Sequence, residues 1–271
     1  MSIGSVICLV GCGLPWLLTE CHWPLPVALL TVFLVSAGIG LTHGLLITRL
    51  RLQPFIVTLC GLLLYRGITR GFTNDQTTGF GDGFKGLRLL ATGKIPVPFV
   101  HGFEIPAPWL VLVLVASIAA VFLNCTIYGR YLLTVGRNED AARYSGINTG
   151  RMTVLAYVIS STLAGLGGVL FVLDVNSAQP VDFGNFYELY AIAAAVLGGC
   201  SLRGGEGSIL GVLIGTALIL VLRNVVTLVT SHNNIEFAIV GAVILGGVIV
   251  DELVKRVALR RRATREAAEA A

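Results

Sequence analysis

The sequence GRNEDAARYSGINTGR, residues 136–151, is a polar stretch between two apolar runs. The runs are Pro108–Thr126, which carries no charge, and Thr153–Leu173. Each is close to the roughly 20 residues that an α-helix needs to cross a bilayer. The stretch therefore connects two membrane-spanning helices, and the remainder of the chain follows the same alternation of apolar runs and polar connections.

The stretch itself has the signals of a short helix. Asn138 belongs to the residue types that cap helix N-termini, and Glu139 and Asp140 place negative charge on the first turn. Gly146 is a natural stop, and Asn148 can cap the element that follows. Because two helical turns are not stable in isolation, the stretch predicts an exposed helix that a partner protein holds.

The composition places the chain in a membrane. Hydrophobic residues make up 55% of the chain and charged residues 13%, whereas soluble domains carry about 25% charged residues. The 33 glycines suit helices that pack closely in lipid. The six cysteines mostly lie in apolar runs without metal-ligand spacing, so we expect buried thiols and no metal site.

The apolar runs predict an all-α integral membrane protein, a polytopic bundle of about eight transmembrane or partial-span helices. The predicted segments are Ile3–Thr19, Val27–Thr48, Pro54–Phe72, Pro108–Thr126, Thr153–Leu173, Leu189–Cys200, Ser208–Leu228 and Phe237–Val250. The segment at 189–200 is short and ends in a Gly-rich stretch, residues 198–207, so we expect a partial span followed by a hairpin bend. We assign residues 1–250 to a transmembrane domain with a polar loop at 127–152, and residues 251–271 to a basic tail.

Orientation follows from the Lys and Arg residues of short loops. The basic tail predicts a cytoplasmic C-terminus, and counting back puts the turn at Arg49 and Arg51, the loop 127–152 and the bend at Arg203 on the same side. The opposite side receives the connections Glu20–Pro26, Asn74–Ala107, Asn176–Tyr187 and Thr230–Asn234.

The sequence gives little support to an enzyme. His-Glu-x-x-His, Gly-x-Ser-x-Gly and the P-loop are absent from the sequence, so any ATP must be hydrolysed by another chain. Charged residues within spans are few and lie near segment ends. We expect Asp174, Glu188 and Glu236 to reach the membrane interface or to pair at helix ends. The lack of a buried relay of acids argues against a proton-coupled carrier and favours a neutral solute.

A neutral polar solute needs hydroxyl and amide partners and an aromatic face. The candidates for a solute pathway are Thr58, Ser160, Ser161, Asn176, Ser177, Gln179 and Tyr187. Packing or capping explains each of them equally well. Small residues at Gly207, Gly211 and Gly215 and in the run Ala164–Gly168 predict close contacts between helices, either within one subunit or between subunits.

Four stretches together resemble the permeases of ribose/xylose-type ATP-binding-cassette importers. They are GRNEDAARYSGINTGR at 136–151, QPFIVTL at 53–59, SAQP at 177–180 and AIAAAVLGGCSLRGG at 191–205, in the family's order over essentially the whole chain. The set is specific to the permease family and much less specific to one sugar. Arg203 and the neighbouring Cys200 depart from the pattern, since small residues are common there in the family.

The N-terminus is a second departure from the family pattern. The residues Met1–Val6 resemble the end of a Gly-Ile-Asp-Leu-Ser-Val-Gly-Ser-like stretch, which in the family follows further membrane segments. We therefore expect the chain to lack roughly the first two membrane segments of its relatives.

The resemblance implies a non-catalytic permease subunit of a bacterial inner membrane that imports a monosaccharide such as ribose or xylose. The implied partners are an ABC ATPase subunit that binds ATP and Mg²⁺, a second permease subunit in a homodimer or heterodimer, an extracytoplasmic sugar-binding protein and membrane lipid. No cofactor bound by this chain and no nucleic-acid partner is expected. The polar stretch would be the coupling helix that docks on the ATPase, through Gly136, Arg137, Asn138, Glu139, Asp140, Ala141, Ala142, Arg143, Ser145 and Gly146.

Two alternatives remain open from the sequence. The first is a sister permease for nucleosides or branched-chain amino acids. The second belongs to a different class, a stand-alone channel or ion-coupled carrier. The exposed capped helix separates these classes, because a stand-alone carrier has no use for an ATPase-docking element.

Overall fold

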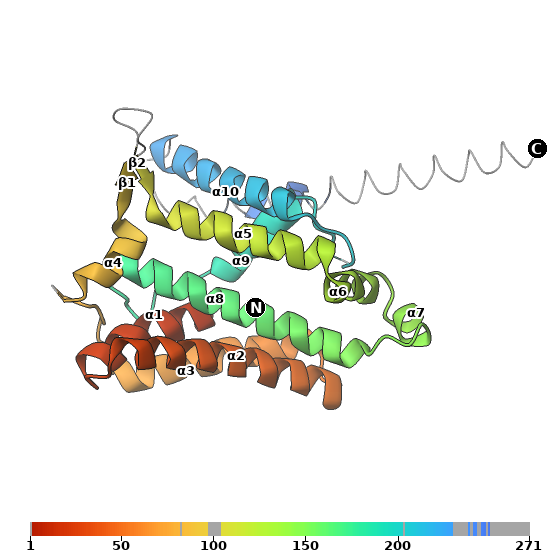
Figure 1. Cartoon of the computed structure of the whole chain (residues 1–271), viewed down its shortest axis with the longest axis horizontal. Coiled ribbons are helices and arrows are strands. Elements are labelled where there is room, and N and C mark those ends of the chain that lie inside the picture. The colour runs from red at the N-terminus through yellow and green to blue at the C-terminus, as the bar shows by residue number, and fades with distance from the viewer. Residues whose placement is uncertain are drawn as a thin grey trace, which may run out of the picture. The chain divides into compact units, whose positions relative to one another are not determined.

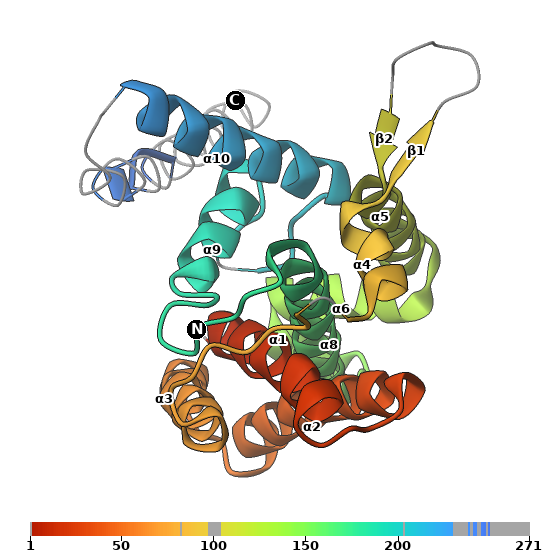
Figure 2. The ribbon, with the colours of Figure 1, turned by 90° about the vertical axis from the view of Figure 1, so that its left-hand side faces the viewer.

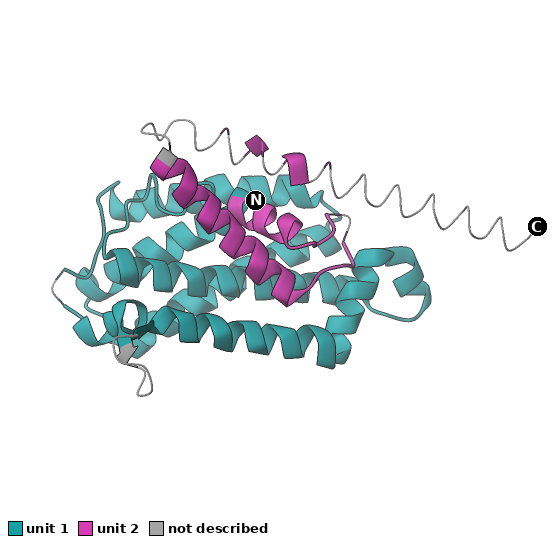
Figure 3. Cartoon of the chain, turned by 90° about the horizontal axis from the view of Figure 1, so that it is seen from above, with its two compact units in different colours: residues 1–189 teal, residues 190–271 magenta. Residues whose placement is uncertain are grey.

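The structure is a computed structural model of the chain (Figure 1). It describes residues 2–81, 83–96, 104–202 and 204–229, together with residues 238, 241, 242, 245–247 and 249. The expected segment Phe237–Val250 lies largely outside the described residues, and Arg203 and the tail 251–271 lie entirely outside them. The chain divides into two compact units, residues 1–189 and residues 190–271 (Figure 3).

The described part of the chain is predominantly helical with very little strand, which confirms the predicted all-α membrane bundle. Its helices are α1 (Ile3–Thr19), α2 (Leu25–Arg49), α3 (Pro54–Thr73), α4 (Lys85–Thr92), α5 (Ala107–Cys125), α6 (Ile127–Arg137), α7 (Glu139–Tyr144), α8 (Thr149–Val175), α9 (Tyr187–Leu197) and α10 (Ile209–Val229). Five of these described helices, α2, α3, α5, α8 and α10, are long and apolar enough to cross a membrane, and α1 and α9 are shorter apolar helices.

Proline sets the starting points of three spanning helices. Pro54 is the first residue of α3, and Pro26 and Pro108 are the second residues of α2 and α5. Proline suits the first turn because the N–H that it lacks has no intrahelical acceptor there. The predicted boundaries of these three segments are correct to within two residues.

Two features between 74 and 137 were not predicted. One is α4 with a two-stranded antiparallel sheet of β1 (Lys94–Pro96) and β2 (Glu104–Pro106), in which Ile95 lies opposite Ile105. The other is α6, which occupies the first part of the polar loop that was expected at 127–152. Both segments lack an apolar run of spanning length, so hydropathy does not mark them as helices or strands.

Helix α1 lies at the centre of the first unit. It packs against α2, α3 and α8, which surround it when the unit is viewed as in Figure 2. Val6, Cys8, Cys12 and Leu14 on α1 are at most 1% exposed. Although apolar like its neighbours, α1 is therefore an interior helix and not a lipid-facing one.

Small residues set the distance between α2 and α8. A Cβ atom on Gly40 would lie 2.5 Å from the carbonyl oxygen of Tyr157, and one on Gly44 would lie 2.7 Å from the Cα of Val154. The run Ala164–Gly168 of α8 was predicted to lie close to another helix, and a Cβ on Gly165 in this run would overlap the Ser36 hydroxyl of α2. The prediction of tight contacts on this face of α8 is confirmed, and the contacts lie within one unit.

The second unit contains a similar glycine contact between α9 and α10. A Cβ on Gly211 would meet the carbonyl oxygen of Gly198, and one on Gly215 would lie 2.8 Å from the amide nitrogen of Gly198. The bend between these helices has Gly199, Gly204 and Gly205 at positive φ, where glycine alone is unstrained. The structure thus confirms the expected hairpin bend after a partial span.

Candidate functional site

The connections of the first unit gather at two opposite ends (Figure 1). Helices α6 and α7 lie at one end, and α4 with the β-hairpin lies at the other. A Cβ on Gly150 would lie 3.7 Å from the Cβ of Thr48, so the α2–α3 turn shares the end of α7. Thr78 and Ala178 exchange two backbone hydrogen bonds of 3.0 and 2.7 Å at the other end. The α2–α3 turn and the polar loop are therefore grouped as the charge rule predicted, while the segment after Ala178 leaves the opposite end and runs along α1 to Gly4. The side that faces the cytoplasm stays a prediction.

The predicted short helix is present as α7, and hydrogen bonds define both of its ends. The Asn138 side-chain oxygen accepts a 3.0 Å hydrogen bond from the Ala141 amide, which caps the N-terminus. Gly146 has φ of +81°, and the amide of Ile147 donates to the carbonyl of Ala142 over 3.1 Å. Asn148 then caps α8 through the Arg151 amide at 3.0 Å. These bonds make α7 a defined element despite its length of six residues.

One residue anchors α7, and the others face outward. The side chain of Ala142 is fully buried, whereas Glu139, Asp140, Ala141 and Arg143 are exposed. Tyr144, which is not among the predicted coupling residues, is 91% exposed at the end of the helix. Exposed aromatic side chains are typical anchors of protein interfaces. The signal that identifies Tyr144 is a single aromatic residue within an otherwise polar stretch.

Helix α6 carries α7 away from the membrane-spanning helix α5. Its N-terminus is capped by the Thr126 hydroxyl, which accepts a 3.1 Å hydrogen bond from the Gly129 amide. Helix α6 contacts α5, α7 and α8. A movement at α7 would thus reach two long apolar helices through packed elements.

A non-helical segment at 176–186 joins α8 to α9 and crosses the buried helix α1. The thiols of Cys8 and Cys12 donate to the carbonyls of Pro180 and Ala178, at 3.4 and 3.7 Å. Phe183 lies over Gly11, where a Cβ would come 2.9 Å from the ring carbon Cζ. Irregular backbone in a membrane protein requires such internal donors, because lipid offers none. The two cysteines therefore pack as small residues and also satisfy this segment.

Arg66 on α3 binds the same segment from the side. Its guanidinium donates to the carbonyls of Val181 and Phe183, at 3.0 and 3.4 Å, and to the side-chain oxygen of Asn185 at 3.1 Å. Planar guanidinium groups suit several acceptors in fixed directions, as these three are. The segment is thus fastened to both α1 and α3.

The structure brings some of the solute-pathway candidates together. Asn176, Ser177 and Gln179 lie on the 176–186 segment, and the Tyr187 ring next to it is 5.4 Å from that of Phe171. The remaining candidates, Thr58 on α3 and Ser160 and Ser161 in the middle of α8, lie away from this segment. The hydroxyl of Thr58 bonds the helix backbone at Pro54 over 2.9 Å. That these residues contact a solute stays a prediction.

The structure buries one of the charged residues. Glu188, which was expected to reach the membrane interface or to pair at a helix end, lies in the first turn of α9 and is only 8% exposed, so it does not reach the interface. Its carboxylate occupies the place that a Cβ atom on Gly4 of α1 would take. Asp174 is exposed, as expected, and Glu236 lies outside the described residues. The Glu188 carboxylate is buried because α1 has no side chain at Gly4 to exclude it.

One protein family matches most of the length of the chain. Residues 1–248 match the family described as branched-chain amino acid transport system / permease component. No solved structure matches the chain.

Curated relatives align with most of the length of the chain. The chain is 34% identical over 253 residues to the ribose import permease protein of Haemophilus influenzae, an alignment that covers 93% of this chain and 76% of the relative. It is 38% identical over 210 residues to the ribose import permease protein of Bacillus subtilis, covering 77% of this chain and 62% of the relative. It is 29% identical over 256 residues to the D-allose transport system permease protein of Escherichia coli, covering 94% and 76%.

Proposed function

The chain belongs to the family of branched-chain amino acid transport system / permease components, and from this premise we propose that it is a membrane permease subunit of an ATP-driven importer for monosaccharides. The chain is a multi-pass membrane protein with five described helices of spanning character. The proposal has it form part of the solute pathway, while a separate ATPase supplies the energy.

The substrate class is supported by the relatives and by the chemistry of the spans. The relatives named above are described as ribose import and D-allose transport permeases, so both a pentose and a hexose are represented. A neutral sugar also fits spans whose few charged residues are bound within the fold, such as Arg66 with its three acceptors on the 176–186 segment. We assign the class and not one sugar.

The observation that carries the ATPase coupling is the geometry of α7. A helix of six residues is capped at both ends, anchored by one buried alanine and exposed elsewhere. A capped helix transmits a displacement that a slack loop would absorb. We infer that α7 docks on the ATPase, with Tyr144 as the aromatic anchor and Glu139, Asp140 and Arg143 as polar contacts around it.

The remaining partners follow from the importer mechanism. A second permease subunit, identical or related, would complete the pathway, and an extracytoplasmic binding protein would deliver the sugar to the end of the first unit opposite α7. ATP and Mg²⁺ would be bound by the ATPase. Docking of the ATPase on α7 predicts that this end faces the cytoplasm.

Substitution of Tyr144 tests the coupling. The tagged full-length chain is purified from its native membranes, and the amounts of co-purifying ATPase and of sugar uptake are measured. Tyr144→Ala is expected to lower both, because loss of a central aromatic contact costs about 2 kcal/mol or more of binding energy. Tyr128→Ala, on α6 and 56% exposed, is the matched control.

Two results of these measurements would contradict the proposal. Normal association and uptake with Tyr144→Ala would contradict docking through α7. Uptake of L-leucine without uptake of D-ribose or D-allose would contradict the proposed substrate class and favour the amino-acid permease alternative.

A further inference from the structure

A polar hollow of about 530 Å³ lies at the end of the first unit opposite α7. It lies between the C-terminal ends of α1 and α3 and the loop at 74–81, and its volume is within the roughly 300–1,000 Å³ of small-molecule sites. Its walls combine aromatic rings with polar side chains, including Trp16, Phe72, Phe80, Glu20, Asn74 and Gln76.

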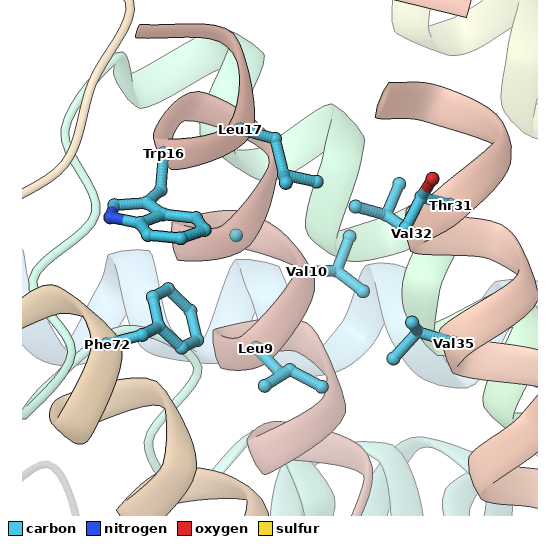
Figure 4. Close-up of a pocket in the computed structure, with 9 residues that line it drawn as sticks. Leu9, Val10, Trp16, Leu17, Thr31, Val32, Val35 and Phe72 are labelled. Atoms are coloured by element: carbon cyan, nitrogen blue, oxygen red, sulfur yellow. The ribbon is translucent and has the colours of Figure 1, made fainter. Parts of the chain in front are cut away.

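Two of the aromatic rings form a wall between this hollow and the apolar interior. The ring centroids of Trp16 and Phe72 are 5.1 Å apart, and both residues also line an apolar hollow of about 240 Å³ between α1 and α2. Figure 4 shows that second hollow, in which the two rings lie opposite Val32 and Val35. The indole nitrogen of Trp16 lies on the side of the ring away from Val10 (Figure 4), so its N–H donor avoids the apolar hollow.

Several polar side chains of the hollow have unused hydrogen-bonding capacity. Within the described part of the chain, the side chains of Glu20, Asn74 and Gln76 make no hydrogen bond or ion pair with another residue. The hydroxyl of Thr73, in contrast, is bonded to the carbonyl of Thr69 at 2.8 Å. The unused groups include a carboxylate, which only accepts, and two amides, which both donate and accept.

The loop that presents these groups is held in place. Arg70 forms a two-pronged bond to Asp75, with Nε–Oδ1 of 2.6 Å and Nη2–Oδ2 of 2.8 Å. The Asn176 side chain accepts from the Phe80 amide and donates to the Gly81 carbonyl, both at 3.0 Å. Asn176, a solute-pathway candidate from the sequence, thus shapes one wall of the hollow. A site whose parts are held before binding loses less entropy when a ligand binds.

We propose that this hollow is a binding site for a monosaccharide, a conclusion that rests on the proposed function. The C–H face of the sugar ring packs on the wall formed by Trp16 and Phe72. Glu20, Asn74 and Gln76 bond the hydroxyl groups, with Glu20 accepting and the amides acting in both directions. Paired donors and acceptors around an aromatic face suit a neutral polyol, whereas an amino acid zwitterion would need a cation for its carboxylate.

Fluorescence of Trp16 tests the site without the ATPase. The chain has three tryptophans, so the double variant Trp23→Phe, Trp109→Phe leaves Trp16 as the only one. The full-length variant in lipid nanodiscs is titrated with D-ribose, D-allose and L-leucine, each to 100 mM as about the upper limit for a weak site. We expect a saturable change of Trp16 emission with the sugars only.

A pair of substitutions identifies the polar contacts. In the single-tryptophan background, Gln76→Ala is expected to weaken sugar binding about tenfold, as for the loss of a good hydrogen bond. Gln53→Ala, an exposed position at the opposite end of α3, should leave binding unchanged. Glu20→Gln, which keeps size and exposure, is expected to weaken binding similarly.

The outcomes separate the site from the proposed function. No saturable response to either sugar, or equal binding by the Gln76 and Gln53 variants, would overturn the site, and measured sugar uptake by the complex would leave the importer proposal intact. A response to L-leucine alone, together with leucine uptake, would overturn both.

Discussion

At the scale of single residues, the absence of side chains at a few glycines sets how closely the helices approach. Gly40 is buried against the backbone of α8, whereas a Cβ on Gly38, two residues earlier on α2, would meet nothing within 4 Å. In a helix interior alanine is otherwise favoured over glycine by about 0.5–1 kcal/mol. The two positions therefore predict effects of opposite sign from the same substitution.

Gly40→Ala is expected to destabilise the fold by about 1–3 kcal/mol, because the contacted atoms of Tyr157 and Val158 are backbone atoms that cannot rotate away. Gly38→Ala should be neutral or slightly stabilising. Thermal unfolding of both variants in the same detergent measures the difference. Equal midpoints would mean that α2 and α8 are less closely packed than described.

The ion pair beside the polar hollow predicts a pH dependence. Hydrogen bonding to the Arg70 guanidinium lowers the pKa of Asp75 below its ordinary value. A carboxyl whose folded-state pKa is lowered stabilises the fold fully above its unfolded pKa of about 3.9, and this stability is lost as the pH falls through the lower, folded value.

We therefore expect wild type to be more stable than Asp75→Asn at neutral pH and the two to converge only below about pH 4. Unfolding midpoints of both proteins from pH 7 to pH 3 measure this. A difference that stays constant over that range would show that ionisation of Asp75 is not the cause.

At the scale of elements, the N-terminal cap is expected to contribute much of the stability of the short helix α7. Asn138→Ala removes the acceptor of the Ala141 amide and should cost the helix about 1 kcal/mol. Asn138→Asp keeps a side-chain acceptor for the Ala141 amide and should preserve the stability of the helix. Hydrogen exchange of the Ala141 amide is expected to be about fivefold faster in the alanine variant, in line with that energy. Unchanged exchange would mean that packing at Ala142, not the cap, holds the helix.

Helix α7 could be predicted from the sequence because its determinants are local. Asn138, Gly146 and Asn148 act on amides within a few residues of themselves, so type and spacing suffice. The central position of α1 could not be predicted in this way. Lipid and a helical bundle interior are equally apolar, so hydropathy does not distinguish a buried helix from a lipid-facing one. The spacing of Gly4, Cys8 and Gly11 on α1 was the available signal.

The polar hollow was beyond sequence reasoning for a related reason. Its walls come from α1, α3 and the loop at 74–81, and Asn176 from a distant part of the chain shapes one of them. The sequence did identify Asn176 as a pathway candidate from its chemistry. It could not show that Trp16 and Gln76 line the same hollow.

The hydrogen bonds from Arg66 to the 176–186 segment predict that this side chain holds the segment against α3. Arg66→Met should lower stability by about 1.5–3 kcal/mol, since hydrogen bonds from a charged donor are lost and carbonyls are left unpaired. Arg66→Lys should recover little of this lost stability, because an ammonium group cannot bond the acceptors on Val181, Phe183 and Asn185 together.

Thiol labelling tests directly whether Arg66 holds the segment. Replacement of Cys21, Cys60, Cys125 and Cys200 by Ser leaves only the buried pair beneath the segment. A membrane-permeant maleimide should react with this pair faster in Arg66→Met than in the unsubstituted background. Equal labelling rates would indicate that the segment is held by α1 alone.

At the scale of the first unit, two ends have different chemistry. One end presents an exposed capped helix, and the other presents a polar hollow with an aromatic wall. The apolar helices α2 and α8 run between them, packed against each other at glycines 40 and 165 and their neighbours. An importer needs this arrangement, because the site that receives the solute and the site that receives the energy must lie on opposite faces of the membrane.

The orientation of these ends is the prediction on which the whole proposal depends. In the background that keeps only Cys8 and Cys12, single cysteines are introduced as Ser145→Cys at α7 and Thr77→Cys at the polar hollow, both exposed. An impermeant maleimide applied to spheroplasts should label Thr77→Cys, and should label Ser145→Cys only after permeabilisation. Gln53→Cys, on the α2–α3 turn, should behave like Ser145→Cys because Thr48 and Gly150 bring that turn to the same end. The reverse pattern would place α7 outside the cell, where no ATPase could reach it, and would put the polar hollow on the wrong face to receive a sugar.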